Sequence, residues 1–268
     1  MIIIGEKING SIPATAKAIA ERDEKFIRNL ARRQTDCGAD YLDVNAGTAH
    51  EHEAETLRWL MGIVQDEVDT PICIDSSSPE SILDAILLAK KEGMINSVSD
   101  EARKCERLFP GVAKTGWKII ALTCDDNGIP TDPGIKREIA GTIIEKAAAE
   151  GIEQDRLYVD ALVNTIATTP LAQLSFSEAV RGIKEEWPDV HFTSGLSNIS
   201  FGMPFRKAIN MSFLVLAMNA GMDSAIMDPT NPDMLAALYA TRLMLNDDEY
   251  CADYLTAYRD GLFGAKKA

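Results

Sequence analysis

The stretch at 71–97, PICIDSSSPESILDAILLAKKEGMINS, predicts a short strand, a helix and a second strand. Its first apolar run, Pro71–Ile74, leads into a serine-rich turn, and Pro79 then stands where the first turn of a helix accepts proline. The apolar residues of Ser81–Leu88 recur at helical spacing, and Met94–Ser97 forms the second run. The stretch is therefore typical of a strand–helix–strand unit, the building block of parallel sheets.

The same alternation extends in both directions from this unit. Short apolar runs recur at intervals of roughly 25–40 residues, the spacing expected of such units. Helical periodicity separates them, as in Glu24–Arg33, where Phe26, Ile27 and Leu30 share one face. The eight predicted strands are Met1–Ile4, Tyr41–Val44, Pro71–Ile74, Met94–Ser97, Lys118–Leu122, Leu157–Val159, His191–Thr193 and Ser224–Met227. Further helices are predicted in Ala54–Val64, Ser81–Leu88, Lys136–Ala149 and Asp233–Leu245.

This arrangement decides the expected fold class. Eight strands alternating with helices in about 250 residues favour a (β/α)8 barrel over an open doubly wound sheet. We expect an α/β protein with a single TIM-barrel domain spanning residues 1–268, which ends in a helix and a short tail from about residue 247. No G-x-G-x-x-G follows the first strand and no Walker A motif occurs, so the usual dinucleotide and P-loop sites lose their main support.

The composition excludes several classes of partner. The 268 residues include 27 basic and 41 acidic ones, and the net charge of −14 argues against binding to nucleic acid or to an anionic membrane. No segment approaches about 20 uninterrupted apolar residues and no signal-peptide pattern opens the chain, so we expect a cytoplasmic protein. The five cysteines are scattered without a CxxC pair, which predicts neither a disulfide framework nor a structural zinc site.

Polar residues follow most of the predicted strands, at the end where such a barrel carries its active site. For any one of them, turn formation or helix capping is the simpler explanation. As a set they almost lack Lys, Arg and His, so they do not suit a phosphate and instead suit a neutral heterocycle with N–H donors and carbonyl acceptors. The set consists of Asp43, Asn45, Asp75, Asn96, Asp160, Ser197, Asn198 and Asp228.

The histidines predict no metal centre and no catalytic triad. His50 and His52 are two residues apart and so do not share a helix face, while His191 begins a strand at the opposite end of the barrel. No G-x-S-x-G motif is present to support a serine nucleophile. We therefore expect no bound metal ion.

The motifs at the strand ends form an ordered set that covers nearly the whole chain. They are IGEKING at 4–10, LDVN at 42–45, CIDS at 73–76, MINS at 94–97, LYVD at 157–160, GLSNIS at 195–200 and AIMD at 225–228. In this order they resemble the pterin-binding methyltransferases, a family that moves a methyl group between tetrahydrofolate and a corrinoid protein. The resemblance implies a pterin-binding barrel with tetrahydrofolate or 5-methyltetrahydrofolate as its substrate.

The resemblance also implies roles for individual residues. Asp75, Asn96 and Asp160 are expected to hold the pyrimidine edge of the pterin, and Asn198 to lie near N5, the nitrogen that carries the methyl group. Asn198, with Asp75 and Asp160 as further catalytic candidates, can strengthen a hydrogen bond as charge develops on N5 but cannot supply a proton. A water chain linked to Asp43 or Asp160 is therefore the expected proton route. The other predicted binding residues are Gly195, Ser197, Arg206 and Met227.

The same resemblance implies that the cobalamin comes from elsewhere. Corrinoid domains of the family carry Asp-x-His-x-x-Gly, and the nearest approach here, DVHFTS at 189–194, ends in serine and leads into a predicted strand. Because the barrel uses the whole chain, we expect the corrinoid to arrive free or on a corrinoid protein that docks over the strand ends. A homodimer is also implied, without any signal in the sequence for its interface.

Several alternatives stay open at this point. Phe201 stands where acetogenic members of the family have a glutamine, so a member that makes 5-methyltetrahydrofolate from a methylcorrinoid fits at least as well as an acetogenic one. Arg206 either meets the p-aminobenzoyl-glutamate tail of folate or is an exposed structural arginine. A dihydropteroate synthase, which needs basic residues for pyrophosphate, and a non-catalytic folate-binding protein are the competing functions.

Overall fold

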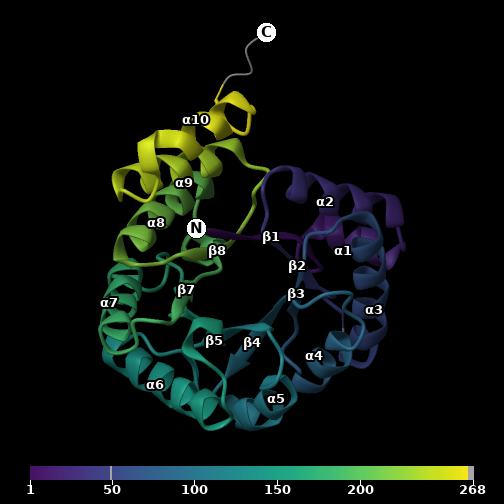
Figure 1. Cartoon of the computed structure of the whole chain (residues 1–268), viewed down its shortest axis with the longest axis horizontal. Helices are drawn as coiled ribbons and strands as arrows, with labels where there is room; N and C mark the ends of the chain where they lie inside the picture. The colour runs from purple at the N-terminus through teal and green to yellow at the C-terminus, as the bar shows by residue number, and fades with distance from the viewer. Residues whose placement is uncertain (49, 265–268) are drawn as a thin grey trace.

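Parallel strands form one eight-stranded sheet at the centre of the molecule, and helices surround it (Figure 1). This computed structural model describes residues 1–48 and 50–264. The sheet order β7-β6-β5-β4-β3-β2-β1-β8 places consecutive strands side by side and β1 beside β8. The strands are β1 (Ile2–Asn9), β2 (Tyr41–Asn45), β3 (Ile72–Asp75), β4 (Met94–Ser99), β5 (Lys118–Leu122), β6 (Leu157–Asp160), β7 (His191–Thr193) and β8 (Ser224–Met227).

The sheet closes between β7 and β8 through separate hydrogen bonds rather than a continuous ladder. The Asp223 N–H donates to Phe192 O at 3.2 Å, and the Ile226 N–H donates to Ser194 O at 3.0 Å. Gly195 and Ile226 add one isolated parallel bridge. We call this junction the β7–β8 seam. It turns the sheet into a barrel, and the predicted (β/α)8 fold is confirmed.

The helices begin at caps that the sequence offers. Asp23, Ser78, Asp132 and Asn231 each accept a backbone N–H at the start of a helix. The helices are α1 (Pro13–Ala20), α2 (Glu24–Asp36), α3 (His50–Glu67), α4 (Pro79–Ile86), α5 (Lys104–Val112), α6 (Pro133–Ala149), α7 (Ala172–Glu186), α8 (Arg206–Ala220), α9 (Pro232–Met244) and α10 (Ala252–Arg259). Short 3-10 helices are η1 (Glu101–Arg103), η2 (Gln154–Arg156), η3 (Leu196–Ser200) and η4 (Glu249–Cys251).

The inside of the barrel is filled in the half where the strands begin. Ile4, Cys73, Met94, Ile120 and Tyr158 are all nearly inaccessible and pack together within the ring. A larger core fills the space between the sheet and the helices. Because side chains fill the first half, open space inside the ring is left at the end where the strands stop.

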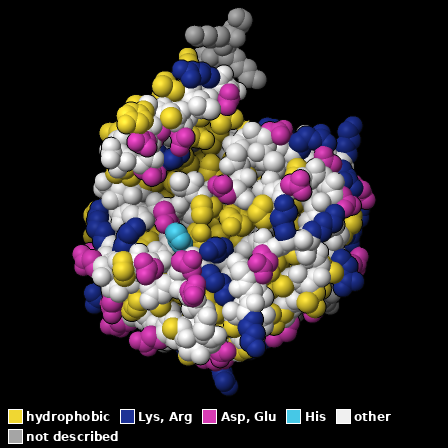
Figure 2. Space-filling view, viewed as in Figure 1, with side chains coloured by type: hydrophobic (Ala, Val, Ile, Leu, Met, Phe, Trp, Pro, Cys, Tyr) yellow, Lys and Arg dark blue, Asp and Glu magenta, His cyan; other side chains and the backbone are white. Residues whose placement is uncertain are grey.

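The surface is polar over the outer helices. Figure 2 shows acidic and basic side chains interspersed there, with hydrophobic side chains gathered near the barrel axis and around α10. None of the helices in the described part of the chain is long and apolar enough to cross a membrane.

The first strand is longer than predicted. The prediction ended it at Ile4 because Glu6 and Lys7 interrupt the apolar run, whereas β1 continues through them across an irregularity between Gly5 and Ile8. Such a bulge redirects side chains and is common beside functional sites. The correction therefore adds two charged residues to the rim of the barrel.

The C-terminal segment agrees in part with its prediction. From about residue 247 the chain forms η4 and α10, and residues 265–268 of the expected tail lie outside the described residues. The single-domain span 1–268 stays a prediction.

Candidate active site

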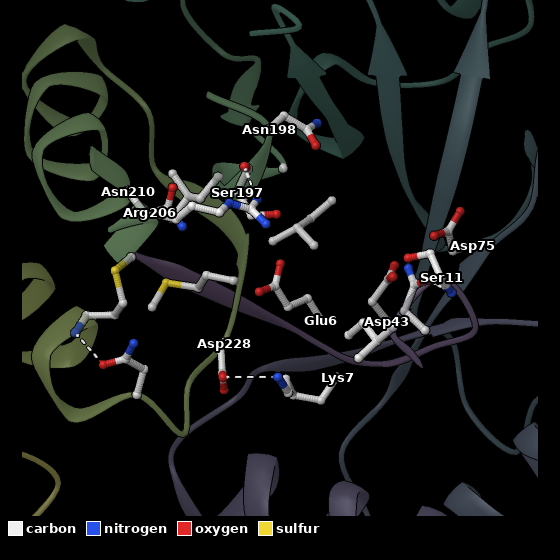
Figure 3. A pocket seen from close by; sticks show the side chains of 18 of the residues that line it. Glu6, Lys7, Ser11, Asp43, Asp75, Ser197, Asn198, Arg206, Asn210 and Asp228 are labelled. Atoms are coloured by element: carbon white, nitrogen blue, oxygen red, sulfur yellow. Dashed lines mark hydrogen bonds and ion pairs between the residues drawn. The ribbon is translucent and has the colours of Figure 1, made fainter. Parts of the chain in front are cut away.

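A cavity of about 570 Å³ opens where the strands end. Strands β1 to β4 supply one side of its lining, and η3, α8 and the end of β8 supply the other (Figure 3). The carboxyl ends of parallel strands meet at one rim, so residues far apart in the sequence come together here. The position is the one that the sequence predicted for the active site.

Two carboxyl groups, Asp43 on β2 and Asp75 on β3, lie close together in this lining. The Asn96 amide donates from Nδ2 to Asp43 Oδ1 at 3.1 Å. Burial, and then the charge of Asp75, raises the pKa of Asp43 well above its usual value. Burial also raises the pKa of Asp75 to about 6, although hydrogen bonds from Asn45 and Asp43 lower it. With a pKa of about 6, Asp75 carries a negative charge at neutral pH, whereas the ionised form of Asp43 is disfavoured.

Asp160 ends β6 and does not line the cavity, unlike the other predicted site residues. Its side chain accepts the Leu162 N–H at 2.8 Å, and its backbone carbonyl accepts the Thr123 N–H at 3.0 Å. Burial raises the pKa of Asp160 to about 6, while hydrogen bonds from the Leu162 and Gly195 backbones and the charge of Lys136 lower it. Asp160 thus ties the loop after β6 to the start of η3, and its contact with a pterin stays a prediction.

Asn198 and Ser197 lie on η3, directly after β7. Arg206 at the start of α8 braces this short helix, because its Nη2 donates to Ser197 O at 2.7 Å and its Nε donates to Ser200 Oγ at 3.0 Å. The guanidinium carbon also lies 5.4 Å from the centre of the Phe201 ring. Arg206 lines the cavity as well, so its structural role and a contact with substrate are compatible.

The cavity contains seven of the eight predicted site residues, and Asp160 is the exception. Their predicted contacts with folate stay predictions. The seven are Asp75, Asn96, Gly195, Ser197, Asn198, Arg206 and Met227.

Sequence reasoning assigned no role to several further polar residues in the lining, among them Glu6, Lys7 and Asn210. Lys7 forms an ion pair with Asp228, with Nζ 3.3 Å from Oδ2. Asn210 Oδ1 is buried and has no hydrogen-bond partner among the described residues, so it is available to a donor on a ligand. For Glu6 and Lys7, the sequence signal that could have revealed them was the motif at 4–10, in which these two charged residues interrupt the apolar run of the first strand.

The cavity offers carboxylate, amide and hydroxyl groups rather than metal ligands. Neither histidine nor cysteine lines it. Within the described residues, no group of three or more His, Cys, Asp and Glu is arranged to hold a metal ion. The donors and acceptors present suit a flat heterocycle with N–H and carbonyl groups along its edge.

The barrel and its polar cavity are those of a protein that binds a flat heterocycle, and the family match identifies the heterocycle as a pterin. The family described as pterin binding enzyme matches residues 14–228, and the chain belongs to this family. The chain is 47% identical over 270 residues to the methylcorrinoid:tetrahydrofolate methyltransferase of Eubacterium limosum, covering 100% of both. It is also 31% identical over 245 residues to the methionine synthase of Mycobacterium tuberculosis, covering 84% of this chain and 20% of that much longer protein.

Solved structures share the fold. The dihydropteroate synthase of Xanthomonas albilineans in complex with 7,8-dihydropteroate superposes with a TM-score of 0.65 at 16% identity, covering 92% of this chain and 94% of that chain. The enzyme of Stenotrophomonas maltophilia gives 0.67 at 18% identity, covering 93% and 94%. At these identities the likeness concerns the architecture alone.

Proposed function

We propose that this protein transfers a methyl group between N5 of tetrahydrofolate and the cobalt of a corrinoid carried by a partner protein. The observation that carries the proposal is the 47% identity along the full length of a methylcorrinoid:tetrahydrofolate methyltransferase. The similarity to methionine synthase supports the same chemistry. The corrinoid supplies or receives the methyl group, and the barrel binds and orients the folate.

The negative charge on Asp75 supports the binding of the pterin at the β2–β4 side of the cavity. A carboxylate that faces ring N–H donors makes charge-assisted hydrogen bonds, which are about twice as strong as neutral ones. Asn96 adds an amide beside it, and its bond to Asp43 holds that amide in place. Asp160 completes the proposed set if the pterin reaches past the lining to β6.

Asn198 is the proposed residue at N5. Its amide can orient a hydrogen bond that strengthens as charge changes on this nitrogen during methyl transfer. Arg206 holds the backbone of the preceding Ser197, so η3 presents Asn198 in a defined position. Arg206 is also placed to meet the folate tail.

The partner docks over the same rim in this proposal. Two large apolar side chains in the loop after η3, Phe201 and Phe205, are 66% and 79% exposed. Large exposed apolar side chains beside a reaction site suit a protein–protein contact, in which the partner covers them. The physiological direction that we favour makes 5-methyltetrahydrofolate from a methylcorrinoid, the direction in which the E. limosum methylcorrinoid:tetrahydrofolate methyltransferase is named.

We further propose a cytoplasmic homodimer. Large apolar side chains are exposed on and beside α8, α9 and α10, and a second copy would cover them; examples are Leu216, Met244, Tyr250 and Leu255. The cysteines are free, which fits a reducing compartment. Sedimentation velocity tests the dimer directly, since a monomer at micromolar concentration would contradict it.

The competing synthase needs free cations for a pyrophosphate. Both lysines in the lining already pair with a carboxylate, Lys7 with Asp228 and Lys207 with Asp233, which leaves Arg206 as the cation of the lining without an ion pair among the described residues. The geometry therefore favours methyl transfer over condensation of a pterin pyrophosphate.

Anaerobic mixing of the protein with methylcobalamin and tetrahydrofolate tests the proposal. We expect the corrinoid spectrum to change as 5-methyltetrahydrofolate forms. Asp75→Ala and Asn198→Ala should each lose activity by roughly 100-fold. The exposed Asp84→Ala and Asn29→Ala are matched controls that should keep it. A wild-type protein that binds no folate would refute the proposed function.

A further inference from the structure

Glu6 occupies the cavity because the backbone of β1 is irregular at this point. The Lys7 N–H leaves the strand ladder and donates to Gln34 Oε1 at 2.9 Å. The same oxygen would lie 2.6 Å from a Cβ at Gly5, so only glycine lets the fully buried Gln34 approach. The bulge is thus built into the fold, and it directs Glu6 towards the space inside the rim.

The Glu6 carboxylate faces this space without a partner among the residues that the structure describes. Figure 3 shows it between Asp43 on one side and Arg206 with Ser197 on the other. The neighbouring cations are engaged elsewhere, since Lys7 pairs with Asp228 and Arg206 donates to Ser197 O. Glu6 is partly buried, and its carboxylate, with no hydrogen bond of its own within the described part of the chain, is available to accept one from a ligand.

The environment of Glu6 lets it exchange a proton near neutral pH. Burial first, and then the charge of Asp228, raises the pKa of Glu6 to about 7, while Lys7 and Arg206 oppose the shift. Asp43 and Lys207 complete the titratable groups that line the cavity around it, together with Asp75. A general base works best when its pKa lies near the working pH.

We propose that Glu6 is the group that accepts the N5 proton of tetrahydrofolate during methyl transfer and returns it in the reverse reaction. The inference rests on the proposed function. The N5 lone pair forms the new C–N bond, and cobalt keeps the electron pair of the broken Co–C bond and becomes Co(I). The proton that N5 loses passes to the Glu6 carboxylate, which becomes a neutral acid.

The topology places Glu6 on the appropriate side of the substrate. Asp75 and Asn96, which are proposed to hold the pyrimidine edge, come from β3 and β4. Glu6 comes from β1, next to β8 and the β7–β8 seam that precedes Asn198. The pyrazine half of the pterin, which contains N5, then faces the side of the barrel that carries Asn198 and Glu6. The amide orients N5, and Glu6 supplies the titratable function that the amide lacks.

The test compares wild type with Glu6→Gln, which keeps the size of the side chain and removes its proton exchange. Single-turnover methyl transfer from methylcobalamin is followed from pH 5.5 to 8.5 with saturating tetrahydrofolate, so that protonation of binding residues does not limit the rate. The rate of methyl transfer by wild type should increase as the pH rises through about 7. The rate of Glu6→Gln should be roughly 100-fold lower, and its pH profile should show no inflection near pH 7. Folate affinity, measured by fluorescence titration, should change less than about threefold. Glu145→Gln on the outer surface of α6 is the matched control.

The possible results separate this proposal from the proposed function. A Glu6→Gln protein with wild-type rates and the same inflection would overturn the role of Glu6 while methyl transfer stands. Wild-type protein without any transfer would overturn both. If Glu6→Gln is slow because it is misfolded, its circular dichroism and folate affinity will differ from those of wild type. In that case Glu6→Asp, which retains the carboxylate, should restore a pH-dependent rate. A Glu6→Asp protein without a pH-dependent rate would also count against the role of Glu6.

Discussion

Replacement of Asp75 by asparagine probes how the cavity recognises a pterin. The change keeps the shape of the side chain and removes the charge that Asp75, with a pKa of about 6, carries at neutral pH. A hydrogen bond to a charged group contributes about 1.5–3 kcal/mol. Its loss should weaken tetrahydrofolate binding roughly 10- to 150-fold at pH 7.5, since 1.36 kcal/mol corresponds to a factor of ten.

The pH dependence gives a second, sharper readout. The pKa of Asp75 is raised to about 6 in the free protein, so wild-type affinity should fall as the pH drops below that value and the carboxylate takes up a proton. Asp75→Asn cannot take up this proton, so its affinity for tetrahydrofolate should not show the fall below pH 6 that protonation of Asp75 causes in wild type. Isothermal titration calorimetry from pH 5 to 8 measures both effects, with Asp84→Asn as the exposed control. Equal affinity at pH 7.5, or an unchanged acid limb, would refute the reasoning.

Three further substitutions test the framework around the cavity by urea denaturation. Burial lowers the pKa of Lys136 to about 8, so as the pH rises the folded protein releases this proton before the unfolded chain does. Between pH 7 and 9.5 the free energy of unfolding of wild type should therefore rise by about 2 kcal/mol relative to that of Lys136→Met. A difference between the two proteins that does not change with pH would contradict this. Arg156→Met should destabilise by about 3 kcal/mol, because the buried guanidinium donates to three backbone carbonyls; a loss below about 0.5 kcal/mol would be inconsistent with that network. Gly5→Ala should lower the free energy of unfolding by about 2 kcal/mol, because the new methyl group clashes with Gln34, and it should also slow methyl transfer. Gly62→Ala, which has open space around its Cβ, should not lower the free energy of unfolding.

The alternation of strands and helices could be predicted because the interior strands are apolar runs bounded by turns. Met94 and Ile95 open such a run, and the structure places β4 there. The polar ends of these strands then indicated the rim. Asp75, Asn96 and Asn198 were predicted to converge, and they line one cavity.

The missed features depend on long-range contacts that a local pattern does not contain. Glu6 lies in a strand whose second half is polar, and its direction depends on a bulge held by Gln34, which is distant in sequence. The burial of Asp160 outside the lining likewise depends on the backbone of Leu162 and on Lys136. Motif order identified the right segments, but it carried no information on which side chains the backbone turns inward.

The β7–β8 seam also affects how the protein moves. Junctions held by a few separate hydrogen bonds open more readily than continuous ladders, and their amides exchange hydrogen with solvent faster. The segment that carries Asn198 is attached to this junction, whereas Asp75 and Asn96 are register partners in the continuous β3–β4 ladder. The side of the cavity formed by β3 and β4 is therefore expected to be rigid, and the side that carries Asn198 to open locally more often. A pterin that contacts both sides would link the two edges of the β7–β8 seam, so substrate binding and the ordering of Asn198 would occur together.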